Sequence, residues 1–104
     1  MSHRVEKAND TMRALAADFV QRTLENSAIV TVTNLGLSPD LKTAIVFVSV
    51  YPEALEAETL DFLKRKAGEL RHYVLERIKI RKVPFFEFAL DKGEKNRQRI
   101  DELV

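Results

Sequence analysis

The chain has 104 residues, of which 45% are hydrophobic and 32% charged, with 17 Lys or Arg against 16 Asp or Glu. This size and apolar content fit one globular domain and exclude a disordered chain, whose apolar content is too low to offset chain entropy. The chain has no cysteine, which excludes disulfides, thiolate metal ligands and a cysteine nucleophile.

The first predicted element is an amphipathic helix over residues 1–25. Its apolar residues, from Val5 through Met12 to Phe19, recur at the three- and four-residue spacing of one helix face. The polar residues Asn26 and Ser27 end it, because both favour a chain reversal. We expect this helix to pack its apolar face against a sheet.

Residues 28–51 are predicted to form a β-hairpin. In its first strand Val30 and Val32 share one face, but Leu35 and Leu37 fall on the opposite parity. A β-bulge near residues 33–36 would bring both pairs to the same face. The second strand, which ends at Tyr51, is apolar on both faces and is therefore predicted to be central.

A kinked helix pair is predicted over residues 53–80, because apolar residues keep a helical period there and Gly68 is the only break. Alternation of Phe86 and Phe88 with Phe85 and Glu87 predicts a third strand over residues 83–90. Residues 91–104 are predicted to be a polar tail. Residues 1–104 thus form a single domain in this interpretation.

The predicted order of elements is α-β-β-α-kink-α-β. We expect an α+β two-layer sandwich, in which the helices cover one face of a three-stranded mixed sheet. The connection between the second and third strands is long enough for a right-handed crossover, which makes these two strands parallel.

Charge is unevenly distributed along the predicted helix pair. Residues 53–63 contain four acids and no base, whereas residues 64–82 contain eight Lys or Arg and only two acids, Glu69 and Glu76. Most of these bases therefore lack a local partner, and we predict that the segment binds an anionic ligand. A merely solvated helix face is the alternative.

RNA suits this segment as a ligand. Lys and Arg supply phosphate contacts, and a glycine kink lets a phosphodiester approach where a Cβ would obstruct it. If Leu63, Ala67 and Leu70 face inward, most bases, Arg71 among them, point outward. The candidate RNA-binding residues are Lys64, Arg65, Lys66, Gly68, Arg71, Arg77, Lys79, Arg81 and Lys82, with Arg4 and Lys7 as weaker candidates.

Catalysis has little support in the sequence. His3 and His72 are the only histidines, they match no local metal-ligand spacing, and no glycine-rich phosphate-binding motif occurs. We predict no catalytic residue, no metal site and no cofactor. No stretch approaches the roughly 20 apolar residues that cross a bilayer, and no secretion signal is recognisable, so we expect a cytoplasmic protein.

A second apolar stripe lies on the sheet face opposite the helices. It contains Ile45, Phe47, Tyr51 and Phe85. We expect the polar tail to bury this stripe, in preference to a role in base stacking.

Four segments resemble the bacterial ribosome-binding factor A family, which has a type II KH-like domain. They are "RVEKANDTMRALAADFV" in the first helix, "VTVTNLGLSPDLKTAIVFVSV" in the hairpin, "VPFFEF" in the third strand and "RQRIDELV" in the tail. The resemblance spans essentially the whole chain. The family's Ala-x-Gly kink reads Lys66-Ala67-Gly68 here, and its Asp-Pro-Arg after the first helix reads Asn26-Ser27-Ala28.

The resemblance implies a monomeric, cytoplasmic assembly factor that is not an enzyme. Its expected partners are 16S rRNA and the small ribosomal subunit, whose rRNA processing and late maturation it assists, with a link to growth in the cold. No small-molecule substrate and no membrane contact are expected.

Two other functions stand as alternatives. A protein-interaction module without direct RNA binding would use the aromatic face around Phe47, Tyr51 and Phe85. An acylphosphatase-like enzyme is disfavoured, because such small α+β folds open on a strand and this chain opens on a helix.

Overall fold

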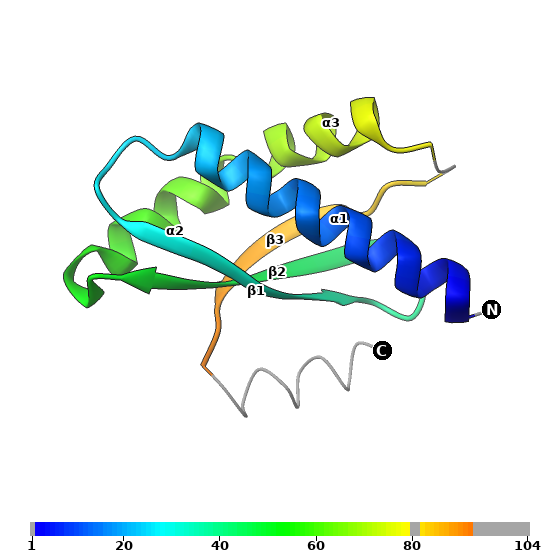
Figure 1. Ribbon diagram of the computed structural model, residues 1–104, viewed down its shortest axis with the longest axis horizontal. Coiled ribbons are helices and arrows are strands. Elements are labelled where there is room, and N and C mark those ends of the chain that lie inside the picture. Colours follow the sequence, from blue (N-terminus) through cyan, green and yellow to red (C-terminus); the bar gives the residue numbers. More distant parts are fainter. Residues whose placement is uncertain (1, 80–81, 93–104) are drawn as a thin grey trace.

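The computed structural model of the chain describes residues 2–79 and 82–92. Figure 1 shows the helices on one side of the sheet. The elements and the three-stranded sheet confirm the predicted α+β class and element order. Most of the predicted tail, from residue 93 on, lies outside the described residues. The elements are α1 (Ser2–Thr23), β1 (Ile29–Leu37), β2 (Thr43–Tyr51), the short 3₁₀ helix η1 (Glu53–Leu55), α2 (Glu56–Arg65), α3 (Ala67–Arg77) and β3 (Phe85–Leu90).

The strands are arranged in the order β1-β2-β3. The central strand β2 pairs with β1 antiparallel and with β3 parallel. The predicted mixed sheet, with its parallel second and third strands, is therefore confirmed. The helix pair α2–α3 forms the connection between these two strands. The crossover from β2 to β3 therefore places the pair over one face of the sheet.

The predicted β-bulge lies at Thr33. The register between β1 and β2 shifts between Val32 and Asn34, so that one residue has no partner across the ladder. The shift returns Leu35 and Leu37 to the face that already carries Val30, and all three are buried. The apolar phase slip of the sequence is thus the signature of the bulge.

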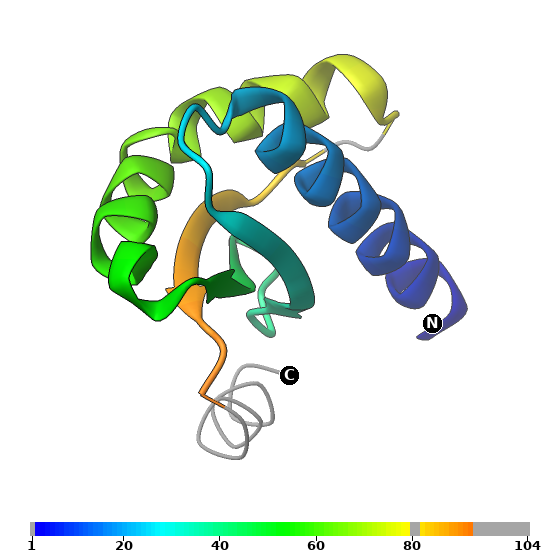
Figure 2. The same cartoon turned by 60° about the vertical axis from the view of Figure 1, so that its left-hand side comes forward.

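The core fills the space between the helices and one face of the sheet. Figure 2 shows the helices in an arc over this face. Full burial of an aliphatic or aromatic side chain contributes about 1.5–3 kcal/mol, so these contacts fix the helices on the sheet. The fully buried residues include Met12, Ala16 and Val20 of α1, Leu63 of α2, Leu70 and Val74 of α3, and Val46 and Val48 of β2.

The two edge strands differ in the side-chain hydrogen bonds that they receive. On the β1 edge, α1 donates side-chain hydrogen bonds to strand carbonyls, from Asn9 to Leu35 and from Gln21 to Val30, each at 3.0 Å. Such cover blunts an edge that would otherwise pair with another strand. On the β3 edge no described side chain bonds to Phe86 or Phe88 in this way.

The apolar stripe on the second sheet face is split. Ile45 and Phe47 are buried, whereas Tyr51 is 69% and Phe85 is 66% exposed, against the expectation. The part of the tail from residue 93 on, which was expected to cover this stripe, lies outside the described residues. The physical reason is position: Tyr51 ends β2 and Phe85 begins β3, and because these strands are parallel the two rings lie at opposite ends of the sheet. No described helix is long and apolar enough to cross a membrane.

Candidate nucleic-acid interface

The predicted basic residues follow the helix pair and its exit toward β3. Lys64 and Arg65 form the end of α2, Lys66 connects the helices, and Arg71 and Arg77 belong to α3. Lys79 and Lys82 flank the end of the connection that leads to β3. Arg81 and the side chain of Arg4 are outside the described part of the chain.

The helices separate at Lys66, two residues before the glycine that the sequence marks as the break. Lys66 has φ −97° and ψ 3°, and its N–H donates to the Leu63 carbonyl at 2.9 Å, which tightens the last turn of α2. Gly68 already belongs to the first turn of α3. A Cβ built on Gly68 would meet no atom of another element within 4 Å. The kink therefore does not require Gly68, and this position is open to an approaching molecule.

Arg71 contradicts the expectation that it points outward. It is half-buried, and its Nε and Nη2 donate to the Val83 carbonyl at 3.3 and 3.1 Å. Its guanidinium carbon also lies 4.4 Å from the centre of the Phe85 ring. Arg71 comes one helical turn after Ala67 on the side of α3 that faces β3, so its side chain crosses to the start of that strand. Its first role is structural.

Two further cations have partners within the chain. Lys66 pairs with Glu69 at 3.1 Å and lies 5.5 Å from the centre of the Phe62 ring. Arg77 lies 3.6 Å from the centre of the Tyr73 ring and donates to the Tyr73 carbonyl at 3.2 Å. Both remain partly exposed, and surface pairs of this kind contribute at most about 1 kcal/mol, so an anion could displace them.

The remaining four cations are exposed and unpaired. Lys64, Arg65, Lys79 and Lys82 take part in no ion pair or side-chain hydrogen bond among residues 2–79 and 82–92. The weaker candidate Lys7, on α1, is exposed as well. These unpaired charges are what an anionic ligand would meet at the least cost in broken contacts.

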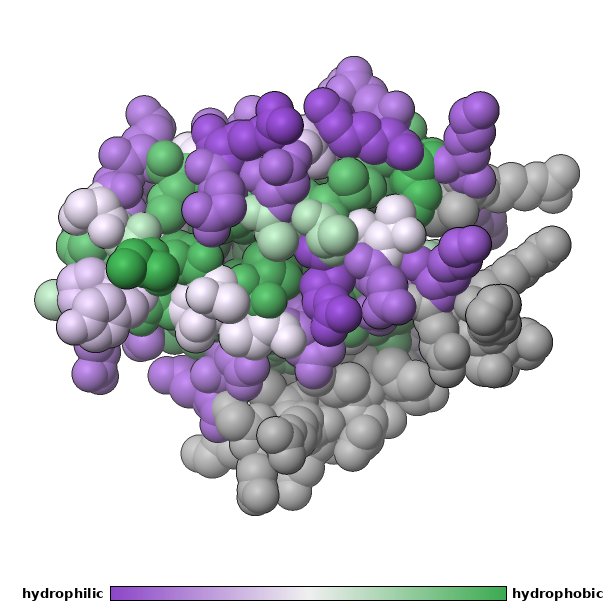
Figure 3. All heavy atoms as spheres, in the orientation of Figure 1, coloured by the Kyte–Doolittle hydropathy of each residue, from purple (hydrophilic) through white to green (hydrophobic). Residues whose placement is uncertain are grey.

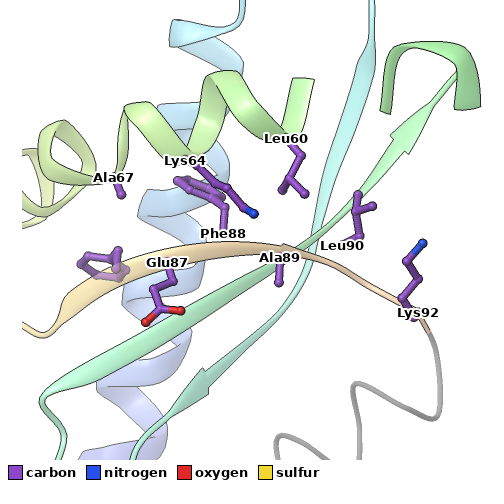
Figure 4. A pocket seen from close by; sticks show the side chains of 9 residues that line it. Leu60, Lys64, Ala67, Glu87, Phe88, Ala89, Leu90 and Lys92 are labelled. Carbon is purple, nitrogen blue, oxygen red and sulfur yellow. The ribbon is translucent and has the colours of Figure 1, made fainter. Parts of the chain in front are cut away.

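A groove of about 530 Å³ runs between the helix pair and the outer edge of β3. Figure 4 shows Leu60 and Lys64 on its helix side and Phe88 and Leu90 on its strand side, with the Glu87 carboxylate turned away from Lys64. Lys92, placed by the sequence in the polar tail, lies at the end of this groove. It was missed as a site residue, although its position directly after β3 is the signal that could have indicated it.

The outer edge of β3 presents backbone hydrogen-bonding groups of Phe86 and Phe88 to this groove. Phe85 donates its N–H to the carbonyl of Lys42, in the turn before β2, at 2.9 Å, and Asp91 donates to the Val48 carbonyl of β2 at 2.8 Å. In a parallel ladder alternate residues bond to the same neighbour, so the N–H and C=O groups of Phe86 and Phe88 point away from β2. Groups of this kind bond to a strand or to the edge of a nucleobase.

A cluster that the sequence did not indicate joins α1 to α3. The Tyr73 hydroxyl donates to the Asp18 carboxylate, which also accepts from Arg22 Nε at 2.8 Å, and the Tyr73 and Phe19 rings meet edge to face at 5.5 Å. The hydrogen bond from Tyr73, opposed by partial burial and aided by Arg22, lowers the pKa of Asp18. The same bond raises the pKa of Tyr73. This cluster holds Arg77 beside Tyr73.

Hydrophilic and hydrophobic side chains occupy different parts of the visible surface. Figure 3 shows hydrophilic side chains over the helices at the upper edge of the view, and hydrophobic ones gathered in the middle. The helix pair therefore meets solvent mainly through its charged residues, and the groove lies beside them.

The element order, the sheet order and the parallel β2–β3 pair define a type II KH-like α+β domain. Its excess of positive charge lies on residues 64–82. Residues 4–104 match the family described as Ribosome-binding factor A. The chain belongs to this family.

Individual relatives and a solved structure agree with this assignment. The chain is 35% identical over 102 residues to "Ribosome-binding factor A" of Opitutus terrae, covering 96% of this chain and 84% of the relative. It is 34% identical over 107 residues to the protein of the same name from Desulforamulus reducens, covering 100% and 89%. The crystal structure of ribosome-binding factor A from Thermus thermophilus has the same fold, with a TM-score of 0.75 at 24% identity over 86% of this chain and 97% of that one.

Proposed function

We propose that this chain binds the small ribosomal subunit through its 16S rRNA and assists rRNA processing and late maturation of the subunit. It acts by binding, as a cytoplasmic monomer without catalysis of its own, and it is linked to growth in the cold. The name shared by its relatives, ribosome-binding factor A, supports the ribosome as the partner.

The four unpaired cations carry the proposal for RNA. Lys64 and Arg65 end α2, where Lys64 lines the groove and Arg65 lies on the side of α2 that faces Asn26. Lys79 and Lys82 continue the positive charge toward β3. Each phosphate contact releases counterions, which makes binding favourable and dependent on salt. The groove beside them offers apolar side chains and strand-edge hydrogen bonds to unpaired bases.

The test is binding to purified small ribosomal subunits by the Lys64→Glu/Arg65→Glu variant. We expect it to bind more than ~10-fold more weakly, because two phosphate contacts of ~1 kcal/mol or more become repulsions. For wild type, four phosphate contacts on unpaired RNA predict a slope of log K against log salt of about −3.

The matched control compares Arg65→Glu with Arg13→Glu. Both are single charge reversals on exposed helix surfaces, and Arg13 lies on α1 with only a 3.4 Å pair to Asp10. Arg13→Glu should bind subunits like wild type. Equal loss in both variants, or wild-type binding that ignores salt, would contradict the proposed interface.

The protein-interaction alternative loses one of its three contacts in the structure. Phe47 is fully buried, so it is unable to meet a partner, whereas Tyr51 remains exposed beside the cross-strand residue Ile29, which is 65% exposed. If Tyr51→Ser weakens subunit binding more than Arg65→Glu does, this alternative replaces the RNA interface.

A further inference from the structure

Phe85 is an exposed aromatic ring in a fixed position. As the first residue of β3 it donates its N–H to the Lys42 carbonyl at 2.9 Å, and it is 66% exposed. A single exposed apolar side chain is ordinary on a protein surface. What distinguishes Phe85 is the group behind the ring.

Arg71 supports one side of this ring. Its guanidinium is held by two hydrogen bonds to the Val83 carbonyl, at 3.3 and 3.1 Å, and lies 4.4 Å from the centre of the Phe85 ring. The cation therefore restricts the ring while most of the ring surface stays exposed to solvent. A preorganised ring loses little freedom when a second flat group stacks on it.

The ring lies beside the groove without lining it, on the face of the sheet opposite the Phe86 side chain. Lys64 and Ala67 line the helix side of the groove, and Arg71 follows Ala67 by one turn of α3. On the strand side, Phe85 directly precedes Phe86, which is part of the groove wall. The unpaired Lys82 lies three residues before the ring. An RNA strand that follows the groove toward Arg71 thus reaches Phe85 in a positive environment.

Tyr51 is the natural comparison, because it is equally exposed but has different neighbours. It is 69% exposed at the other end of the sheet, and the chain continues from it into the acidic segment that begins at Glu53. Among the described residues no cation stacks on Tyr51. The two rings therefore have similar exposure but differ in the charge of their surroundings. A polyanion is favoured only at Phe85, where the nearby charge is positive.

The geometry points to Phe85, supported by Arg71, as a stacking platform for one unpaired nucleobase beside the groove. This inference rests on the proposed RNA-binding function and adds to it the residue that contacts a base. Aromatic stacking is tolerant of sequence, because every base has a flat face. The platform therefore selects unpaired RNA over duplex and places no demand on base identity.

The test uses Phe85→Leu and a fluorescein-labelled, unpaired RNA of about ten nucleotides, with the dissociation constant measured by fluorescence anisotropy at several salt concentrations. Phe85→Leu should bind at least ~5-fold more weakly, the lower end of the effect of one base–aromatic stack. Its salt slope should equal that of wild type, because the ring carries no charge. Phe85→Tyr, which keeps the ring, should bind like wild type.

Tyr51→Leu is the matched control, an aromatic-to-aliphatic change at a site of equal exposure, and it should bind the RNA like wild type. RNAs with a single abasic nucleotide provide a readout that does not depend on the stability of the variant. Wild type should lose affinity at one abasic position, and Phe85→Leu should be insensitive to that position.

The outcomes separate this inference from the proposed function. If wild type binds the RNA with the expected salt slope but Phe85→Leu matches Tyr51→Leu, the stacking platform is wrong and RNA binding stands. If wild type fails to bind unpaired RNA at any salt concentration, the proposed function is wrong as well. If Phe85→Leu weakens binding to intact subunits but not to RNA, the ring contacts protein and the platform is again wrong.

Discussion

The end of α2 and the body of α3 each carry two Lys or Arg side chains, but these side chains have different surroundings. Lys64 and Arg65 end α2, with Lys64 at the groove, and neither has an ion-pair partner among the described residues. Arg71 and Arg77 belong to α3, which packs between α1 and β3, and both find acceptors and aromatic rings there. The number of basic residues therefore overstates the number of cations available to a ligand, because some of them are held by contacts with neighbouring elements.

The largest expected contrast between these regions is in stability. Arg71→Ala should lower the free energy of unfolding by about 2–3 kcal/mol, because it removes charged hydrogen bonds to the buried residue Val83 and a cation–π contact. Arg65→Ala should change it by less than about 0.5 kcal/mol. Urea denaturation of both variants measures the difference. Equal values would mean that α2 and α3 hold their cations alike.

A second prediction concerns the Asp18–Tyr73 cluster, which positions Arg77. Tyr73→Phe should raise the pKa of Asp18 toward its usual value, because the Tyr73 hydroxyl is the main cause of the lowered pKa. An NMR titration of the Asp18 carboxyl carbon measures this. An unchanged pKa in Tyr73→Phe would show that Arg22, rather than Tyr73, holds the carboxylate.

The same cluster gives a pH dependence with a defined sign. A carboxyl whose pKa is lower in the folded state stabilises the protein above its unfolded pKa, and this contribution is lost as the pH falls through the folded pKa. The difference in stability between wild type and Tyr73→Phe should therefore be larger at pH 6 than at pH 2. A pH-independent difference would contradict the linkage.

The smallest effect is expected at the boundary between the two regions. Gly68→Ala should raise the free energy of unfolding by about 0.5–1 kcal/mol, because a Cβ meets no atom of another element within 4 Å and alanine is the better helix former. If RNA approaches the backbone here, the same variant should bind subunits more weakly. Higher stability with unchanged binding would make Gly68 only a tolerated weak point in α3.

The sequence predicts the architecture well because apolar periodicity is a local property. The slip in phase between Val32 and Leu35 was sufficient to locate the bulge at Thr33, and the long connection after β2 was sufficient to predict a parallel β3. The break between the helices was predicted at Gly68 and lies at Lys66, which adopts a non-helical conformation. Lysine has no preference for such a conformation, so the sequence did not indicate this position.

The candidate site was predictable only in outline. Local composition placed the positive charge on residues 64–82 but had no means to separate Arg65 from Arg71, since the partners of Arg71 lie 12 and more residues away on the approach to β3. In the same way, the exposure of Tyr51 and Phe85 depends on where the parallel strands β2 and β3 begin and end.

The amino-acid sequence by itself thus determined the order of helices and strands, the bulge and the position of the basic segment, because each depends on neighbours within a few residues. It also determined the sheet connectivity, because the connection after β2 is long enough for a crossover. Only the tertiary structure decided which cations remain free, which aromatic rings stay exposed and where the groove lies. These depend on contacts such as that of Tyr73 with Asp18, 55 residues apart, which local pattern does not encode.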